Sequence, residues 1–242
     1  TSLRTLGYFD LNSNPKINLM DLHKLTNLQN LQLTCSTVPP AKCLEKNMQL
    51  LSSVLNKLSI LQSVTLVPAS GSSNVNTLQA DNDTGASGMI ISFDGFSSVS
   101  PAPAHLRRLE LSRRCCIFSR LPKWHGELAQ LCVLKIAVKE LSNEDTDILK
   151  GLPALTVLSL HVMTTSAEMI VFGKGGFSVL IYFKFTCTVP WLKFEAGSMP
   201  DLGNLNLCFI GRGADHYSIV PIGMEHLSCL EEITADIWGA YA

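Results

Sequence analysis

The fold of this chain is decided by the stretch Leu152-Pro153-Ala154-Leu155-Thr156-Val157-Leu158-Ser159-Leu160. Its leucines stand at offsets 0, 3, 6 and 8, so the last two point to the same face of an extended strand. One copy of this pattern would say little, because leucine is common in any buried strand. The pattern returns through the whole chain, and recurrence at a nearly constant period predicts a solenoid of stacked repeats.

Eight other segments of the chain carry this pattern, complete or shortened. The positions equivalent to Leu155 are Leu3, Leu28, Leu61, Leu106, Leu131, Leu180, Leu202 and Leu230. Most intervals between them are 22 to 28 residues, which is the period of leucine-rich repeats. We therefore predict an α/β leucine-rich-repeat solenoid, with a curved parallel β-sheet on the concave face and helices or loops on the convex face. Residues 1–242 form a single domain fragment of about nine repeats in this interpretation.

Two intervals are longer than the period, at 33 and 45 residues. The first contains apolar residues at helical spacing, which predicts a helix over 45–58. The second contains an irregular insertion at about 68–104, rich in Gly, Ser, Asn and Pro. Within it, residues 89–93 either pack on the solenoid or form a degenerate strand. A second helix is predicted over 143–150, with Ser142 as its N-cap.

The composition bounds the class of protein. The 242 residues are 46% hydrophobic and 16% charged, with a formal net charge of −1, so no global charge draws the chain to nucleic acid or to a membrane surface. The sequence has no run of 18 or more apolar residues, which predicts no transmembrane segment. Because Thr1 enters directly into a repeat and neither end carries a polar capping repeat, we expect a piece of a longer protein.

The cysteines are scattered among the repeats, and no two of them have CxxC spacing. There are eight: Cys35, Cys43, Cys115, Cys116, Cys132, Cys187, Cys208 and Cys229. Extracellular leucine-rich solenoids gather cysteines at their ends, so this placement predicts reduced thiols and an intracellular setting. The single glycosylation sequon, at Asn82-Asp83-Thr84, is interpreted as a chance match.

Candidate binding residues follow from strand alternation. Side chains between and just after the core leucines point to the concave face, which solenoids use for binding. The candidates on this surface are Arg108, Glu110, Arg113, Lys135, His161, Tyr182, Lys184 and Asn206. A basic cluster over 107–123 has two interpretations. It is either a solvated rim of the solenoid or a docking patch for an acidic protein surface.

The sequence offers no motif for catalysis or for a cofactor. The glycine-rich stretch 172–177 lacks the order of a phosphate-binding loop, and we interpret it as a turn into the next strand. The six histidines show neither HExxH nor Cys/His ligand spacing. We therefore expect no enzymatic activity and no cofactor in this fragment.

Several segments resemble the leucine-rich-repeat domain of plant intracellular immune receptors, of the coiled-coil, nucleotide-binding class found in grasses. They are residues 1–6, 25–31, 227–233 and above all 177–207, which includes Val189-Pro190-Trp191-Leu192-Lys193-Phe194. The resemblance implies a cytoplasmic module that recognises a pathogen effector or a guarded host protein. It also implies intramolecular docking that holds the parent's nucleotide-binding domain inactive. That domain has no match in this chain, so ATP binding is not carried over.

Two other functions remain open from the sequence. An extracellular leucine-rich-repeat receptor ectodomain would carry disulfides and a glycan at Asn82. An F-box-type substrate adaptor of a ubiquitin ligase is also built on such repeats, and its parent protein would carry an F-box. All three interpretations predict protein partners, and none predicts nucleic acid.

Overall fold

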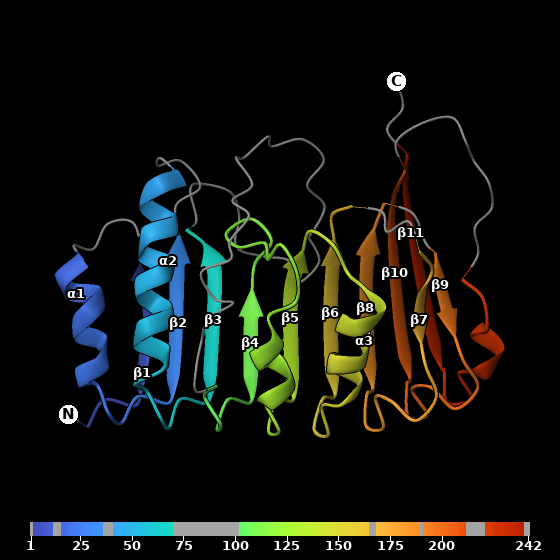
Figure 1. Cartoon of the computed structure of the whole chain (residues 1–242), viewed down its shortest axis with the longest axis horizontal. Coiled ribbons are helices and arrows are strands. Elements are labelled where there is room, and N and C mark those ends of the chain that lie inside the picture. The colour runs from blue at the N-terminus through green and yellow to red at the C-terminus, as the bar shows by residue number, and fades with distance from the viewer. Residues whose placement is uncertain are drawn as a thin grey trace.

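A single sheet of nine parallel strands runs through the molecule, and neighbouring strands follow one another along the chain (Figure 1). The computed structural model describes residues 2–11, 16–35, 41–69, 102–164, 168–188, 191–211 and 221–239. The strands of the sheet are β1 (Thr5–Asp10), β2 (Asn30–Cys35), β3 (Ser63–Pro68), β4 (Arg108–Leu111), β5 (Val133–Val138), β6 (Val157–Val162), β8 (Tyr182–Cys187), β10 (Asn204–Gly211) and β11 (Glu232–Gly239). The predicted α/β leucine-rich-repeat solenoid is thereby confirmed.

The core consists of two rows of apolar side chains that cross the sheet in register. One row is Leu31, Val64, Leu109, Leu134, Leu158, Phe183 and Leu205, and the other is Leu33, Leu66, Leu111, Ile136, Leu160, Phe185 and Leu207. Each of these side chains is at most 3% exposed. Burying a leucine stabilises a fold by about 1.5–3 kcal/mol. The recurring leucines therefore supply most of the driving force for stacking the repeats.

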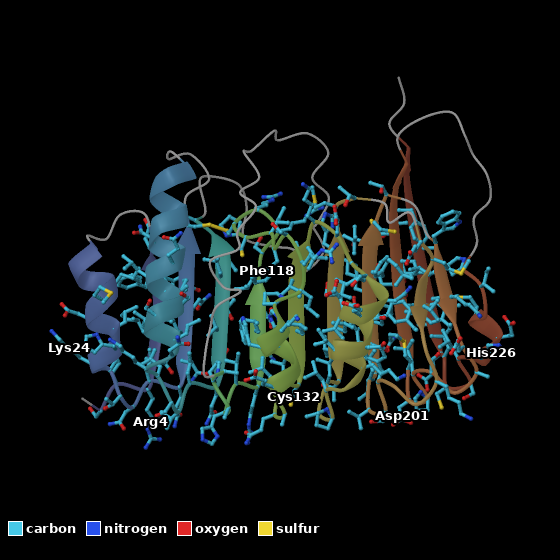
Figure 2. The ribbon with its side chains drawn as sticks, in the orientation of Figure 1. Arg4, Lys24, Phe118, Cys132, Asp201 and His226 are labelled. Carbon is cyan, nitrogen blue, oxygen red and sulfur yellow. A yellow bond between two sulfur atoms is a disulfide. The ribbon has the colours of Figure 1, made fainter. Side chains whose placement is uncertain are left out.

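A ladder of backbone hydrogen bonds joins the repeats where the strands begin. The carbonyl oxygen of Arg4 accepts the N–H groups of Gln29 and Asn30, at 2.8 and 3.0 Å. The same pair of hydrogen bonds to one carbonyl recurs in each repeat down the chain to the carbonyl of Gly203. Every N···O distance lies between 2.8 and 3.1 Å. Figure 2 labels two of the accepting residues, Arg4 and Cys132, along this edge of the sheet. Main-chain groups make these bonds, so the side chains here are free to vary.

Helices and a small second sheet cover one face of the main sheet (Figure 1). The helices are α1 (Lys16–Asp21), α2 (Ala41–Leu55) and α3 (Asn143–Lys150), with 3₁₀ turns η1 (Leu22–Lys24), η2 (Lys123–Glu127) and η3 (Met224–His226). The second sheet pairs β7 (Ile170–Phe172) with β9 (Leu192–Phe194). Within the described ranges, no helix is long and apolar enough to cross a membrane.

Both predicted helices are present. The predicted helix over 45–58 is α2, which begins at Ala41 and ends at Leu55. The helix predicted over 143–150 is α3, and Ser142 is its N-cap. The Ser142 Oγ accepts the N–H of Asp145 at 3.2 Å, and the Asp145 carboxylate accepts the N–H of Ser142 at 2.9 Å. This reciprocal arrangement is a capping box.

The glycine-rich stretch 172–177 turns at Lys174 and Gly175, as predicted, but its first residue, Phe172, ends the strand β7, which was not predicted. The side chain of Asn143, in α3, makes hydrogen bonds to the backbone along the edge of β7. The Oδ1 of Asn143 accepts the N–H of Val171 at 3.0 Å, and its Nδ2 donates to the carbonyl of Met169 at 3.4 Å. Most of the predicted insertion lies at residues 70–101, outside the described residues.

Strand β1 departs from the predicted alternation. A register shift between Leu6 and Phe9 pairs Phe9 with the core residue Leu33, and Phe9 packs against the core. Tyr8 absorbs the shift with a φ of 56° and is 74% exposed. Strand alternation predicts that Phe9 points to the concave face. This prediction is wrong, because Phe9 packs against the core.

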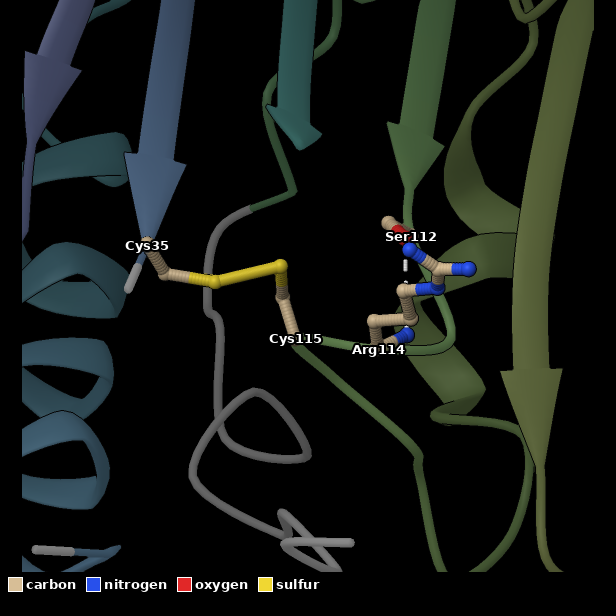
Figure 3. The surroundings of a disulfide bond; sticks show 4 residues. All are labelled: Cys35, Ser112, Arg114 and Cys115. Carbon is tan, nitrogen blue, oxygen red and sulfur yellow. Dashed lines mark hydrogen bonds between the residues drawn. A yellow bond between two sulfur atoms is a disulfide. The ribbon is translucent and has the colours of Figure 1, made fainter. Parts of the chain in front are cut away.

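The prediction of reduced thiols is wrong at two positions. Cys35 and Cys115 form a disulfide, with their Cα atoms 6.4 Å apart. Figure 3 shows the bond crossing from the end of β2 to the turn after β4. The sequence could not indicate this pair, because 80 residues separate the two cysteines. Of the other described cysteines, Cys116, Cys132, Cys187, Cys208 and Cys229 are thiols.

Candidate protein-binding surface

The face of the sheet opposite the helices, called the open face below, presents ordered rows of side chains. The first row is Asn30, Ser63, Arg108, Val133, Val157, Tyr182, Asn204 and Glu232. The second row is Gln32, Thr65, Glu110, Lys135, Ser159, Lys184, Asn206 and Thr234. Neighbours within a row lie about 4.8 Å apart, and the two rows lie about 7 Å apart, because strand geometry fixes both spacings.

Three of the predicted binding residues form one ionic group on β4 and β5. The carboxylate of Glu110 pairs with the guanidinium of Arg108 through one oxygen and with the ammonium of Lys135, at 3.2 Å, through the other. The Glu110 side chain is only 20% exposed, against 50% for Arg108 and 46% for Lys135. Two cations therefore share one carboxylate, and positive charge remains at the surface.

Half-buried apolar side chains lie beside this ionic group. Val133, Val157 and Tyr182 are successive members of the first row on β5, β6 and β8. One step along the same strands, the second row presents Lys135 and Lys184 on either side of Ser159. We call Val133, Val157, Tyr182, Lys135 and Lys184 the basic-apolar strip. The candidates chosen from the sequence include Tyr182 and the two lysines, and the same alternation places Val133 and Val157 on this face beside Tyr182.

Two further candidates lie at the margin of this strip. His161 is half-buried in β6, with its Nε2 3.2 Å from the sulfur of Met163. Asn206 lies next to Lys184 in the second row. Its Oδ1 is buried and has no hydrogen-bond partner within the part of the chain that the structure describes. Buried polar atoms are normally hydrogen-bonded, but this oxygen is enclosed by the chain and offers a partner no exposed acceptor.

Arg113 does not belong to the open face. Strand β4 ends at Leu111, and Arg113 lies in the turn that follows. Other members of the basic cluster over 107–123 also lie away from the open face. Arg120 lies 3.7 Å from Glu140, and Lys123 begins the turn η2, which packs against α3. The cluster is therefore not one docking patch, because consecutive parts of a repeat face different sides of the solenoid.

Charge varies along the open face from one strand to the next. On β4 to β8, the first two rows carry Arg108, Lys135 and Lys184 against one carboxylate, Glu110. At the end of the sheet, Glu232 and Asp236 of β11 are exposed. No group of three or more metal-ligating side chains was found among the described residues. The middle of the open face is therefore complementary to an acidic and partly apolar protein surface.

Known proteins match the chain over almost its entire length. A family model described as a leucine-rich repeat region matches residues 1–242. The chain is 43% identical over 236 residues to the disease resistance protein RGA5 of Oryza sativa subsp. japonica. That match covers 98% of this chain but 20% of the rice protein, so the chain spans about a fifth of its relative. The resemblance to the repeat domain of plant disease resistance proteins is confirmed, and the chain belongs to the leucine-rich repeat family.

Proposed function

We propose that this repeat domain is the protein-recognition module of a plant intracellular immune receptor located in the cytoplasm. It binds a pathogen effector or a guarded host protein, and it also docks on the nucleotide-binding domain of its parent protein to keep that domain inactive. The similarity to a rice disease resistance protein supports the assignment of the chain to an immune receptor. The basic-apolar strip on the open face is the observation that supports recognition of a protein.

The strip favours a partner with carboxylates and apolar side chains close together. Lys135 and Lys184 lie two strands apart, which places their Cα atoms about 10 Å from each other. Val133, Val157 and Tyr182 form the adjacent apolar surface. Tyrosine and desolvated ion pairs at the centre of an interface are frequent anchors of binding energy. An acidic segment lying across β5, β6 and β8 would make both kinds of contact at once.

Charge reversal on the strip tests this proposal. The variant combines Lys135→Glu and Lys184→Glu, and the matched control combines Lys123→Glu and Lys174→Glu, which lie away from the open face. Binding of the 242-residue chain to the separately expressed nucleotide-binding domain of its parent is measured by calorimetry. We expect the strip variant to bind at least about tenfold more weakly, because like charges then oppose each other across the interface. The control should bind like the wild type.

In the full-length parent, the same strip variant should signal without a pathogen, because the inactive state is no longer held. Equal binding by variant and wild type, within about twofold, would remove the open face from the proposed docking. Arg113 is left out of this test, because it lies in the turn after β4 and not on the open face. A variant at Arg113 would leave the strip intact.

One observation favours a second candidate, an extracellular receptor ectodomain. Disulfides such as Cys35–Cys115 persist mainly in oxidising compartments. Mass analysis of the protein purified from its own tissue separates the two candidates. A glycan on Asn82 together with a fully oxidised Cys35–Cys115 pair would support the ectodomain. An unmodified Asn82 would support the intracellular receptor.

A further inference from the structure

The disulfide lies at a defined place in the solenoid. Cys35 is the last residue of β2, and Cys115 lies in the turn after β4, so the bond passes over the end of β3 (Figure 3). The Cα separation of 6.4 Å falls within the normal range for disulfides, about 4.4–6.8 Å. Three successive repeats are thereby tied together at the same edge of the sheet.

The strand β4 forms the shortest junctions in the middle of this sheet. It has four residues, and the other strands of the main sheet have six or eight. Four residue pairs join β3 to β4 and three join β4 to β5, and one isolated bridge between Phe118 and Val138 adds to the second junction. Six pairs join β2 to β3, and six join β5 to β6. In a solenoid, each repeat contacts only its neighbours, so a short junction is where two halves separate first.

Among the described residues, the backbone of the turn 112–116 bonds to another repeat at one point, while the side chains of Cys115 and Cys116 are buried. The N–H of Ser112 donates to the carbonyl of Leu66 at 2.9 Å. The N–H groups of Cys115 and Cys116 both donate to the carbonyl of Ser112, at 2.9 and 3.0 Å, and therefore bond only within the turn. Of these bonds, only that of Ser112 reaches another repeat. The covalent bond to Cys35 therefore adds a strong tie where the hydrogen-bond ladder is short.

We call the junctions of β4 with β3 and with β5 the joint. We propose that the Cys35–Cys115 pair is a reversible modification site that holds the joint closed when oxidised and lets it open when reduced. The joint aligns Thr65, Glu110 and Lys135, which continue the second row of the open face across β3, β4 and β5. Loosening the joint uncouples the N-terminal from the C-terminal part of that surface. The lock follows from the sheet itself and does not depend on which partner the open face binds.

The chemistry needs one co-reactant, a small-molecule disulfide of the glutathione class. The thiol of Cys115, which is 5% exposed, attacks this disulfide first, loses its proton and forms a mixed disulfide, releasing one small thiol. The fully buried thiol of Cys35 then loses its proton and attacks the Cys115 sulfur, which releases the second small thiol. The small disulfide is thus reduced to two thiols, and a dithiol reductant reverses both steps.

The neighbouring thiol Cys116 is unsuited to compete for this exchange. It is buried beside Cys115 in sequence, and desolvation raises the pKa of its thiol to about 12. The thiolate is the form that attacks disulfides, so Cys116 reacts slowly. The pairing of Cys115 with Cys35 rests on geometry, because their Cα atoms lie 6.4 Å apart, within the range that a disulfide spans.

The test compares the wild-type 242-residue chain after glutathione disulfide and after a dithiol reductant. Mass analysis of a non-reducing digest should find the Cys35–Cys115 cross-link only in the first sample. Hydrogen exchange of the β4 amides should be at least about tenfold faster in the second sample, whereas exchange in β8 and β10 should not change. Absence of the cross-link, or equal β4 exchange in the two samples, would overturn the proposal.

Two variants complete the test. Cys35→Ser should show the fast β4 exchange under both conditions, because the lock cannot form. The matched control is Cys187→Ser, because Cys187 is a buried thiol at the end of β8, as Cys35 is at the end of β2. It should retain the redox dependence of the wild type. If Cys35→Ser does not fold, the two states of the wild-type chain still decide the question.

Discussion

The repeats before and after β4 are stabilised on their covered side by different means. After β4, β7 places Phe172 against Phe183 and Phe185 of the main sheet, and Phe194 of β9 stacks on Phe172. The centroid of Phe172 lies 5.1 Å from that of Phe183 and 5.4 Å from that of Phe194. Before β4, no phenylalanine cluster is present among the described residues, and the helix α2 buries Leu51, Val54 and Leu55 instead.

Repeat length accounts for this difference. The repeats from Leu131 to Leu202 are separated by 22 to 25 residues, which leaves room for an eight-residue helix, α3, or a three-residue strand on the covered side. Short strands can pair with one another, as β7 and β9 do, and each places a phenylalanine in the core. The longer intervals before Leu106 hold the helix α2 and the irregular insertion instead. Among the described residues of these repeats, the covered side has no repeating strand, and a disulfide supplies a cross-link.

The largest effect is expected from removing the centre of the phenylalanine cluster. Phe172 is fully buried and contacts rings from β8 and β9. Phe172→Ala should lower the free energy of unfolding by about 3–5 kcal/mol, because it leaves a cavity among tightly packed rings. Urea unfolding measures the loss, and hydrogen exchange shows where it acts. Exchange should rise in β8 and β10 and stay unchanged in β2 and β3.

The conservative variant Phe172→Leu is the control, because it fills part of the volume and should cost less than half as much. An equal rise of exchange in every strand would show that the sheet unfolds as one unit. The contrast between the two sets of repeats would then have no energetic meaning.

The next effect is a loss of stability in acid, centred on the covered side of the joint. His125 in η2 is fully buried, stacks on Trp124 and meets Phe118 edge-on. Its Nδ1 lies 2.9 Å from the carbonyl of Pro122, and its Nε2 has no hydrogen-bond partner among the described residues. Desolvation lowers the pKa of this imidazole from 6.5 to about 4.

The folded chain therefore prefers neutral His125, whereas the unfolded chain takes up a proton below pH 6.5. The free energy of unfolding should fall as the pH is lowered from about 6.5 to 4 and then level off, by about 3 kcal/mol in total for this group. Thermal unfolding of wild type and His125→Phe over this range measures it. The variant keeps an aromatic ring but cannot titrate, so its pH dependence should be weaker by that amount. Parallel profiles would contradict the assignment.

The core was predictable because alternation and repeat period are fixed by covalent geometry. Leu158 and Leu160 face the same side of any strand, and equivalent leucines then define the register of all the repeats. The helix α3 was predictable from Ser142 and Asp145, whose spacing is a local signal. The rows of the open face followed from the same alternation, apart from the shifted strand β1.

Three features lay beyond sequence reasoning for physical reasons. The strands β7 and β9 have three residues each, too few to show a period. The pairing of Cys35 with Cys115 depends on which turns meet in space, and cysteine spacing does not determine connectivity. The position of Arg113 depended on where β4 ends, and strand ends are the least predictable boundaries. Whether the open face binds a partner remains a prediction.

The smallest effect concerns the open side of the joint, where Glu110 bridges Arg108 and Lys135. Glu110→Gln should lower the free energy of unfolding by about 0.5–1 kcal/mol at low salt, because partly exposed ion pairs contribute little. The difference should largely disappear in about 1 M salt, where the screening length is about 3 Å. Hydrogen exchange in β4 should rise slightly. The control Glu232→Gln on β11 should not alter β4.

The same variant sharpens the role of charge at the joint, because stability and binding should change in opposite directions. Removing the carboxylate leaves Arg108 and Lys135 without their shared partner, so an acidic peptide should bind the open face more tightly although the fold is less stable. Fluorescence anisotropy with a labelled peptide of alternating Glu and Leu measures this. A Lys-Leu peptide of equal length should not gain affinity. If stability and affinity for the acidic peptide both decreased, Glu110 would be maintaining the conformation of the open face. The charge of the strip would then not determine which partner binds.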